Sequence, residues 1–164
     1  MSQGDPPPAP TDRSSLQERF APRLACFGCG PANDKGLHIR SYPRGDDVVT
    51  RYRPQPHQEA FTGVLNGGIA GTLFDCHMLW TGAYRYMIEK RLDAPPPMVT
   101  ASYTVSFRRP IPTDGEIEIV ARASEVKGDR VSVDATLVAG GNECATAHGT
   151  FVAVKEGHPA FHRW

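Results

Sequence analysis

Residues 60–84 read AFTGVLNGGIAGTLFDCHMLWTGAY, and this stretch decides the fold of the chain. Asp75 is its only formally charged side chain, and apolar residues recur at helical spacing after the pair Gly67 and Gly68. A helix that is apolar nearly all round is buried. The pattern predicts a helix from Gly67 to about Lys90, roughly 36 Å long at 1.5 Å per residue. Other elements of the chain must therefore cover it.

Alternating apolar and polar residues predict strands on both sides of this helix in the sequence. Two strands are expected before the helix and four after it, at residues 37–42, 48–53, 99–108, 117–126, 131–139 and 144–155. Short turns containing glycine or aspartate join the later strands, which is typical of antiparallel hairpins. We therefore expect an α+β fold in which a curved antiparallel sheet wraps one long central helix.

The chain has 164 residues, which is room for one domain. Residues 1–22 are expected to form a proline-rich tail and a short helix that begins with a capping-box sequence. The folded domain follows at residues 23–157. Residues 158–164 are expected to form a C-terminal strap that packs Phe161 or Trp164 on the domain surface.

Composition argues against several classes of function. Lys and Arg, 18 in all, balance 18 Asp and Glu, so no overall positive charge indicates a nucleic acid or a membrane surface as partner. The N-terminus lacks the apolar core of a secretory signal, and no segment is apolar enough to span a membrane. Four cysteines are too few for a disulfide framework in a chain of this length. These features predict a cytoplasmic protein.

Asp75 is the first candidate for chemistry, because an unpaired carboxylate is costly to bury in an apolar helix. It is either a general base or nucleophile at the mouth of a pocket, or a structural group that is solvated or hydrogen-bonded. Gly67 and Gly68 at the helix start offer free N–H groups at the positive end of the helix dipole, which suit an oxyanion. Alternatively, these glycines only relieve crowding between helix and sheet.

Two motifs together resemble the hotdog-fold acyl-CoA thioesterases of the phenylacetate-pathway (PaaI-like) type. They are GVLNGGIAGTLFDCHMLWT at residues 63–81 and VTASYTVSFRRPIPTDG at residues 99–115. The resemblance extends over residues 36–155, and CFGCGPANDKGL at residues 26–37 resembles a subgroup of these proteins. It implies a hotdog fold and hydrolysis of an acyl- or aryl-CoA thioester to a free acid and coenzyme A. No cofactor is implied, since coenzyme A is part of the substrate.

The resemblance also implies roles for individual residues. Asp75 matches the catalytic carboxylate that activates water or attacks the thioester carbonyl, and Thr100 matches the Ser or Thr that orients the water. Gly68, with Gly67 beside it, matches the backbone N–H that polarises the carbonyl. The family builds each site across a dimer interface, with the acid and the glycines on opposite protomers. A homodimer or a dimer of dimers is therefore expected.

The sequence departs from the family just before the glycine pair. Asn66 replaces the usual His, and an Asn amide can donate a hydrogen bond but cannot shuttle a proton. The Asn or Gln that relatives place near the substrate carbonyl falls on Ala60 by direct counting, and on Gln58 after a two-residue loop insertion. Asn66 and Gln58 are therefore included as candidate catalytic residues. The neighbouring His57 and Glu59 are either functional or ordinary loop residues.

Coenzyme A carries phosphates, which basic side chains at a pocket mouth can bind. Arg108 and Arg109 are candidates at a strand end, although neighbouring strand residues point to opposite faces and at most one is expected to take part. Arg130 is a further candidate, and all three are alternatively solvated surface charges. The acyl group is expected to meet the apolar side chains of Phe61, Leu65, Phe74, Met78 and Tyr103.

Two other functions stay open. A hotdog protein that binds an acyl-CoA or another hydrophobic ligand without turnover is favoured by Asn66, whereas Asp75 and Thr100 favour the enzyme. Hotdog hydratases and dehydratases pair an Asp with a His a few residues downstream. His77 does not fit that pattern, because it lies about 200° round the helix from Asp75. It is interpreted as a hydrogen-bonded interior histidine, and His148 likewise as structural.

Cys26 and Cys29 form a CxxC pair, which is a component of many zinc sites. A zinc ion needs three or four ligands. Cys76 and Cys144 fall in a predicted helix and a predicted strand, and His38 as a third ligand would leave the fourth unassigned. The pair is therefore interpreted as loop packing or free thiols, and no metal is expected.

Overall fold

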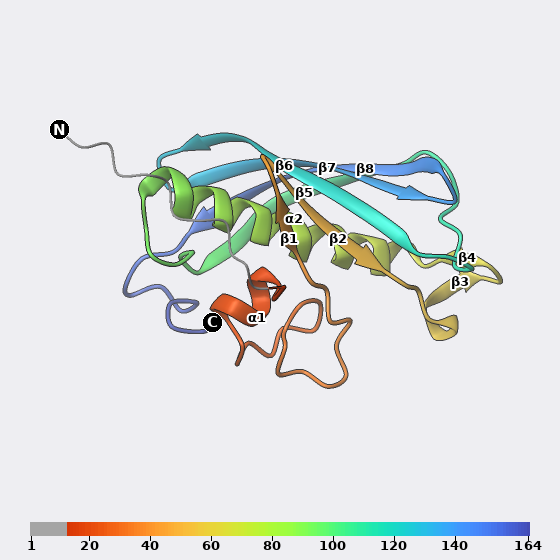
Figure 1. The fold of residues 1–164 in the computed structure, drawn as a ribbon, viewed down its shortest axis with the longest axis horizontal. Coiled ribbons are helices and arrows are strands. Elements are labelled where there is room, and N and C mark those ends of the chain that lie inside the picture. The colour runs from red at the N-terminus through yellow and green to blue at the C-terminus, as the bar shows by residue number, and fades with distance from the viewer. Residues whose placement is uncertain (1–12) are drawn as a thin grey trace.

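A six-stranded antiparallel sheet covers the long helix α2 (Gly67–Lys90) in the computed structural model, which describes residues 13–164 (Figure 1). The strand order across the sheet is β1–β2–β6–β7–β8–β5. The strands are β1 (Tyr42–Arg44), β2 (Asp47–Tyr52), β5 (Met98–Phe107), β6 (Ile117–Lys127), β7 (Arg130–Ala139) and β8 (Asn142–Ala153). The expected α+β fold, one long helix wrapped by a curved antiparallel sheet, is confirmed.

Asn66 starts helix α2 as its N-cap. Its side-chain oxygen Oδ1 accepts hydrogen bonds from the backbone N–H groups of Gly68 at 2.8 Å and Ile69 at 3.2 Å. The helix ends at Arg91, which adopts the left-handed conformation (φ 54°) common at helix C-termini. Both helix ends agree with the sequence prediction.

The core lies between α2 and the inner face of the sheet. Its fully buried members include Leu73, Phe74, Met78 and Trp80 from the helix and Ile119, Val133, Leu137 and Phe151 from the strands. Gly149 on β8 makes room for this layer, since a Cβ atom there would lie 2.8 Å from the Phe151 ring and 3.2 Å from Met78 Cε. The apolar faces predicted for helix and strands therefore meet each other.

The N-terminal segment packs on the helix through a chain of buried polar groups. Helix α1 (Leu16–Phe20) begins with the predicted capping box of Ser15 and Glu18. Gln17 Nε2 donates to Ser41 Oγ at 3.0 Å, and this hydroxyl lies 2.8 Å from His77 Nδ1. His77 Nε2 lies 3.0 Å from the carbonyl oxygen of Val48. The interpretation of His77 as a hydrogen-bonded interior residue is confirmed.

The strand predicted at residues 37–42 is mostly wrong, because regular strand structure begins only at Tyr42. The backbone before it is hydrogen-bonded to a loop instead of a strand. Leu37 N–H donates to Phe27 O at 2.8 Å, and Ile39 N–H donates to Gly28 O at 3.0 Å. The other five expected strands lie within two residues of their predicted ends.

Short elements surround the start of α2. The 3-10 helix η1 (Pro56–Gln58) leads into the small hairpin of β3 (Glu59–Phe61) and β4 (Val64–Leu65). At the other end of the chain the Trp164 ring packs on Trp80, with 4.5 Å between ring centroids. Residues 1–12 of the predicted proline-rich tail lie outside the described residues. Within residues 13–164, no helix has the length and apolar character needed to cross a membrane.

Candidate active site

The structure brings Asp75 and Thr100 together, as predicted. Asp75 lies half-buried on α2, and Thr100 on the edge strand β5 donates from Oγ1 to Asp75 Oδ1 at 2.7 Å. Burial raises the pKa of Asp75 above its ordinary value; the Thr100 hydrogen bond lowers it, and negative charge on Cys26 raises it. Asp75 Oδ2 has no hydrogen-bond partner within residues 13–164. One oxygen of this carboxylate is thus held and the other is free to act as a base.

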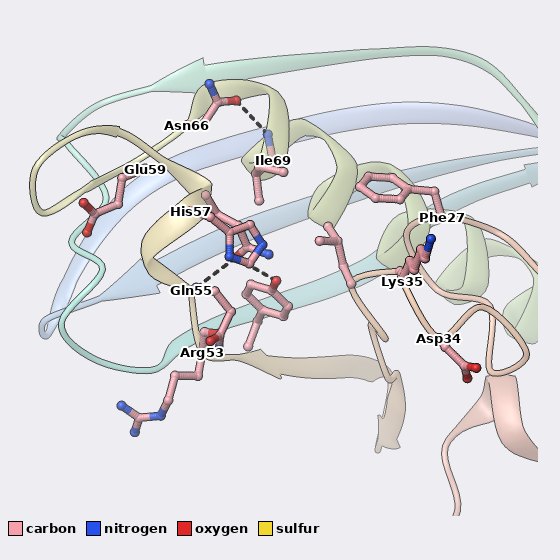
Figure 2. Close-up of a pocket in the computed structure, with 13 residues that line it drawn as sticks. Phe27, Asp34, Lys35, Arg53, Gln55, His57, Glu59, Asn66 and Ile69 are labelled. Carbon is pink, nitrogen blue, oxygen red and sulfur yellow. Dashed lines mark hydrogen bonds between the residues drawn. The ribbon is translucent and has the colours of Figure 1, made fainter.

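The start of α2 offers one free backbone donor among the described residues, and it belongs to one of the two predicted glycines. The N–H of Gly68 is occupied by the cap, since it donates to Asn66 Oδ1. The N–H of Gly67 has no acceptor in the part of the chain that the structure describes. Of the predicted pair Gly67 and Gly68, Gly67 is therefore the residue whose N–H is free. Figure 2 shows the amide oxygen of Asn66 turned toward Ile69, in the capping position.

Gln58 lies beside this helix start with its side chain held in place. Its Oε1 accepts from the Tyr52 hydroxyl and from the Gln55 N–H, each at 2.9 Å. Its backbone carbonyl accepts from Asn66 N–H at 2.9 Å, which ties η1 to the start of α2. With Oε1 occupied twice, only the Nε2 group of Gln58 is available to a ligand, and it can only donate.

A pocket of about 670 Å³ opens beside these residues (Figure 2). Residues from η1, β3 and the helix start form one wall, and the loop before β1 forms another. Its lining includes His57, Gln58, Glu59, Asn66, Phe27 and Lys35. The candidates around residue 58 therefore share a pocket with the cap of α2.

A second groove, of about 470 Å³, contains four of the eight residues predicted to bind substrate. Phe61, Leu65, Arg108 and Arg109 line it together with Gly67. The backbone N–H groups of both arginines donate to one carbonyl oxygen on β8, at 2.7 and 3.0 Å, which fixes the end of β5. Gly67, whose backbone N–H is free, thus lines the same groove as Arg108 and Arg109.

The other four predicted substrate contacts lie elsewhere. Met78 and Phe74 are fully buried between helix and sheet, so their assignment to a pocket wall is wrong. Tyr103 projects from β5 over α2, with its hydroxyl 3.4 Å from where a Cβ on Gly71 would be. Arg130 on β7 pairs with Val152, near one end of β8. The groove lies at the other end of β8, where Phe107 of β5 pairs with Ala145.

Gly67 and Asp75 are too far apart to act on one carbonyl within a single chain. They are eight residues apart on the same helix, which separates them by about 12 Å along its axis. Tyr103 lies over the turn between them. Within one chain the free donor and the carboxylate therefore lie on separate turns of α2.

The structure also gathers cysteines that the sequence interpretation kept apart. The Sγ atoms of Cys26, Cys29 and Cys76 all lie within 4.8 Å of one another. Hydrogen bonds from the other two thiols and from backbone N–H groups lower the pKa of Cys26 to about 2. The sequence interpretation does not count Cys76 as a metal ligand, because it falls in a helix. In the structure, Cys76 directly follows Asp75 on α2 and its side chain faces the CxxC loop. The small residue Gly28 inside CFGCG was the available signal for this close approach.

The comparisons with known proteins agree with this architecture. Residues 62–146, more than half of the chain, match the family described as the thioesterase superfamily. The chain belongs to the thioesterase superfamily, and its fold is the hotdog fold that the two motifs predicted. No protein of curated function matches its sequence.

Several solved structures are similar. A thioesterase superfamily protein from Shewanella loihica PV-4 is 28% identical, with a TM-score of 0.62 over 76% of this chain and 98% of that one. A thioesterase from Haemophilus influenzae is 16% identical, with a TM-score of 0.61 over 74% of this chain and 84% of that one. The PaaI protein of the Escherichia coli phenylacetic acid degradation operon is 14% identical, with a TM-score of 0.60 over 73% and 81% of the two chains. The last two share the fold with this chain.

Proposed function

We propose that this protein is an acyl-CoA thioesterase that hydrolyses an acyl- or aryl-CoA thioester to a free acid and coenzyme A. The observation that carries the proposal is the hydrogen bond from Thr100 Oγ1 to Asp75 Oδ1 at a half-buried carboxylate. Asp75 Oδ2 takes a proton from a water molecule as that water attacks the thioester carbonyl. The hydroxyl hydrogen of Thr100 is engaged in the hydrogen bond to Asp75, so the lone pairs of the threonine oxygen accept a hydrogen bond from the same water.

The carbonyl oxygen gains negative charge as the water adds. Gly67 N–H is the donor for this oxygen, because it is free and lies at the positive end of the α2 dipole. A single donor of this kind is worth about 3–4 kcal/mol to the transition state. The tetrahedral intermediate then collapses, the C–S bond breaks, and the proton held by Asp75 goes to the departing thiolate of coenzyme A.

Two protomers complete each site in this proposal. Strand β5 is at the edge of the sheet and most of its residues are exposed, so its free backbone groups can pair with β5 of a second copy. In an antiparallel pair of identical strands, opposite ends meet. Thr100 lies near one end of β5, beside Asp75, and Phe107 lies at the other, with its ring 3.6 Å from where a Cβ on Gly67 would be. The pairing therefore brings the donor of one protomer to the acid of its partner.

Arg108 and Arg109 give this composite site a basic rim. Both line the groove that contains Gly67, and the phosphates of coenzyme A carry the opposite charge. Phe61 in the same groove is 76% exposed in the single chain, which leaves an apolar surface for the acyl group or for the partner protomer. No metal or redox cofactor takes part in the proposed reaction.

The test is coenzyme A release from a panel of short, medium, long and aryl acyl-CoA thioesters, measured by chromatography so that the protein's own four thiols do not interfere. Wild type is expected to turn over at least one class. Asp75→Asn, which keeps the size of the side chain, is expected to lower kcat by about 10²- to 10⁴-fold. Saturable binding of an acyl-CoA without turnover by wild type would overturn the proposal in favour of a binding protein.

A further inference from the structure

Three cysteine sulfurs lie close together next to Asp75, and the proposed hydrolysis does not use them. Cys26 and Cys29 come from the loop before β1, and Cys76 comes from α2. Cys29 and Cys76 are buried, whereas Cys26 is partly exposed. Cys26 Sγ and Cys76 Sγ are 3.8 Å apart, and all three sulfurs lie within 4.8 Å of one another.

The Cys26–Cys76 separation of 3.8 Å matches that of two thiolates on a tetrahedral metal ion. At a Zn–S distance of about 2.3 Å, two sulfurs on a tetrahedral ion lie about 3.8 Å apart. A disulfide needs its sulfurs at about 2.05 Å and joins only two of them. The arrangement of three sulfurs therefore suits one central ion better than a bond between any pair.

Hydrogen-bond donors point at two of the sulfurs. The backbone N–H groups of Cys29 and Gly28 donate to Cys26 Sγ. The indole N–H of Trp80 donates to Cys29 Sγ at 3.4 Å. A thiol sulfur is a weak acceptor, whereas a metal-bound thiolate is a strong one and is commonly held by such outer donors.

The loop is built to let the sulfurs approach. A Cβ on Gly28 would lie 2.3 Å from Cys76 Sγ, so only glycine admits Cys76 at this position. A Cβ on Gly30 would lie 2.3 Å from the backbone nitrogen of Cys26, and Gly30 N–H closes the turn by donating to Cys26 O at 2.9 Å. Both glycines of CFGCG therefore serve the geometry of the cysteines.

We propose that Cys26, Cys29 and Cys76 bind a thiophilic divalent metal ion, with Zn²⁺ as the expected occupant. Water takes the fourth position on the exposed side of Cys26, because residues 13–164 bring no fourth ligand into this group. The bound ion ties the CFGCG loop, which forms one wall of the 670 Å³ pocket through Phe27, to the helix turn that carries Asp75.

The test uses the full chain, produced without a metal-binding tag and kept reduced. Metal is removed with a chelator, and Zn²⁺ is returned in competition with a chromophoric chelator. One ion per chain is expected. Cys26→Ser, Cys29→Ser and Cys76→Ser should each weaken binding by more than about 100-fold, since losing an outer-shell partner alone costs about 10- to 100-fold. Cys144→Ser is the matched control, because this buried cysteine on β8 lies outside the cluster and should bind like wild type.

Co²⁺ in place of Zn²⁺ gives a second readout on wild type alone, so the test holds even where a serine variant does not fold. Sulfur-to-cobalt charge-transfer absorption with the intense visible bands of a tetrahedral ion is expected. The proposal is overturned when reduced wild type takes up no stoichiometric ion, or when Cys144→Ser loses binding like the other three variants. Because the readout is metal content and not turnover, the result stands whether or not the chain hydrolyses thioesters.

Discussion

Thr100 Oγ1 donates a hydrogen bond of 2.7 Å to Asp75 Oδ1, which joins the edge strand β5 to the central helix at a half-buried carboxylate. The bond fixes one carboxylate oxygen and leaves the other free. It also orients the threonine oxygen, whose lone pairs then face away from the carboxylate. In the proposed reaction, Asp75 and Thr100 form one half of the site for attack by water.

Replacing the hydroxyl of Thr100 tests this half-site. Thr100→Val keeps the shape of the side chain and removes the donor, so both the carboxylate and the attacking water lose their alignment. A kcat lower by about 10²-fold is expected with little change in KM. Thr100→Ser, which keeps the hydroxyl, should retain most of the activity. Equal losses in the two variants would show that the methyl group matters and the hydrogen bond does not.

The other half-site can be tested by removing one backbone N–H. Proline is well accepted at the first helical position, and Asn66 before it already has an extended ψ of 132°. Gly67→Pro should therefore keep the helix and lower kcat by about 10²- to 10³-fold. Gly67→Ala is the control, since it keeps the N–H and its Cβ would lie 3.6 Å from the Phe107 ring, an ordinary contact. An active proline variant would contradict the assignment of this donor.

Asn66 is expected to matter chiefly for stability. Its Oδ1 caps two backbone N–H groups of α2, so Asn66→Ala should lower the free energy of unfolding by about 1 kcal/mol. Asn66→Asp keeps the accepting oxygen and adds a negative charge at the positive end of the dipole, so it should be about as stable as wild type. Chemical denaturation of the three proteins measures this. Equal stability of the alanine and aspartate variants would refute the capping role.

His77 should make the fold sensitive to acid. The Val48 carbonyl can only accept, so Nε2 carries the hydrogen and Nδ1 accepts from Ser41, which holds the imidazole neutral. Burial lowers the pKa of His77 from 6.5 to about 4. As the pH falls, the unfolded chain binds the proton first. The contribution of neutral His77 to the free energy of unfolding is therefore full above pH 6.5. It is lost as the pH falls from 6.5 to about 4, and the loss is on the order of 3 kcal/mol in all.

The measurement is the free energy of unfolding against pH for wild type and His77→Gln, both in chelator so that metal release does not add to the slope. The glutamine variant is expected to be less stable at neutral pH and to lose stability less steeply between pH 6.5 and 4. An unchanged slope in the variant would assign the acid sensitivity to other groups.

Periodicity predicted most of the fold, because strong patterns set the helix and the strands over long stretches of sequence. The apolar run after Gly67 gave both ends of α2, and the pairing of Asp75 with Thr100 followed from motif resemblance. Residues 37–42 were the exception. They alternate like a strand, but their backbone bonds go to the CFGCG loop, and a local pattern cannot show which partner a backbone will find.

At Met78 and Cys76 the structure differs from the sequence interpretation because of contacts between distant segments, whereas at Gly68 the cause is a local capping contact. Met78 is apolar and close to Asp75 in sequence, yet the sheet covers it completely. Gly68 has the expected type and position, but the side chain of Asn66 already occupies its N–H. Cys76 contacts Cys26, which is 50 residues away in the sequence, and the local sequence of either segment does not predict this contact.

A mixed dimer tests the central claim, that donor and acid of one site come from different protomers. Asp75→Asn and Gly67→Pro chains, each inactive alone, are refolded together in equal amounts, and mixed dimers are counted by mass. Half of the dimers should be mixed, each with one intact site of two, so coenzyme A release should recover to about a quarter of the wild-type rate. Mixed dimers that form without any recovery of activity would contradict the composite site.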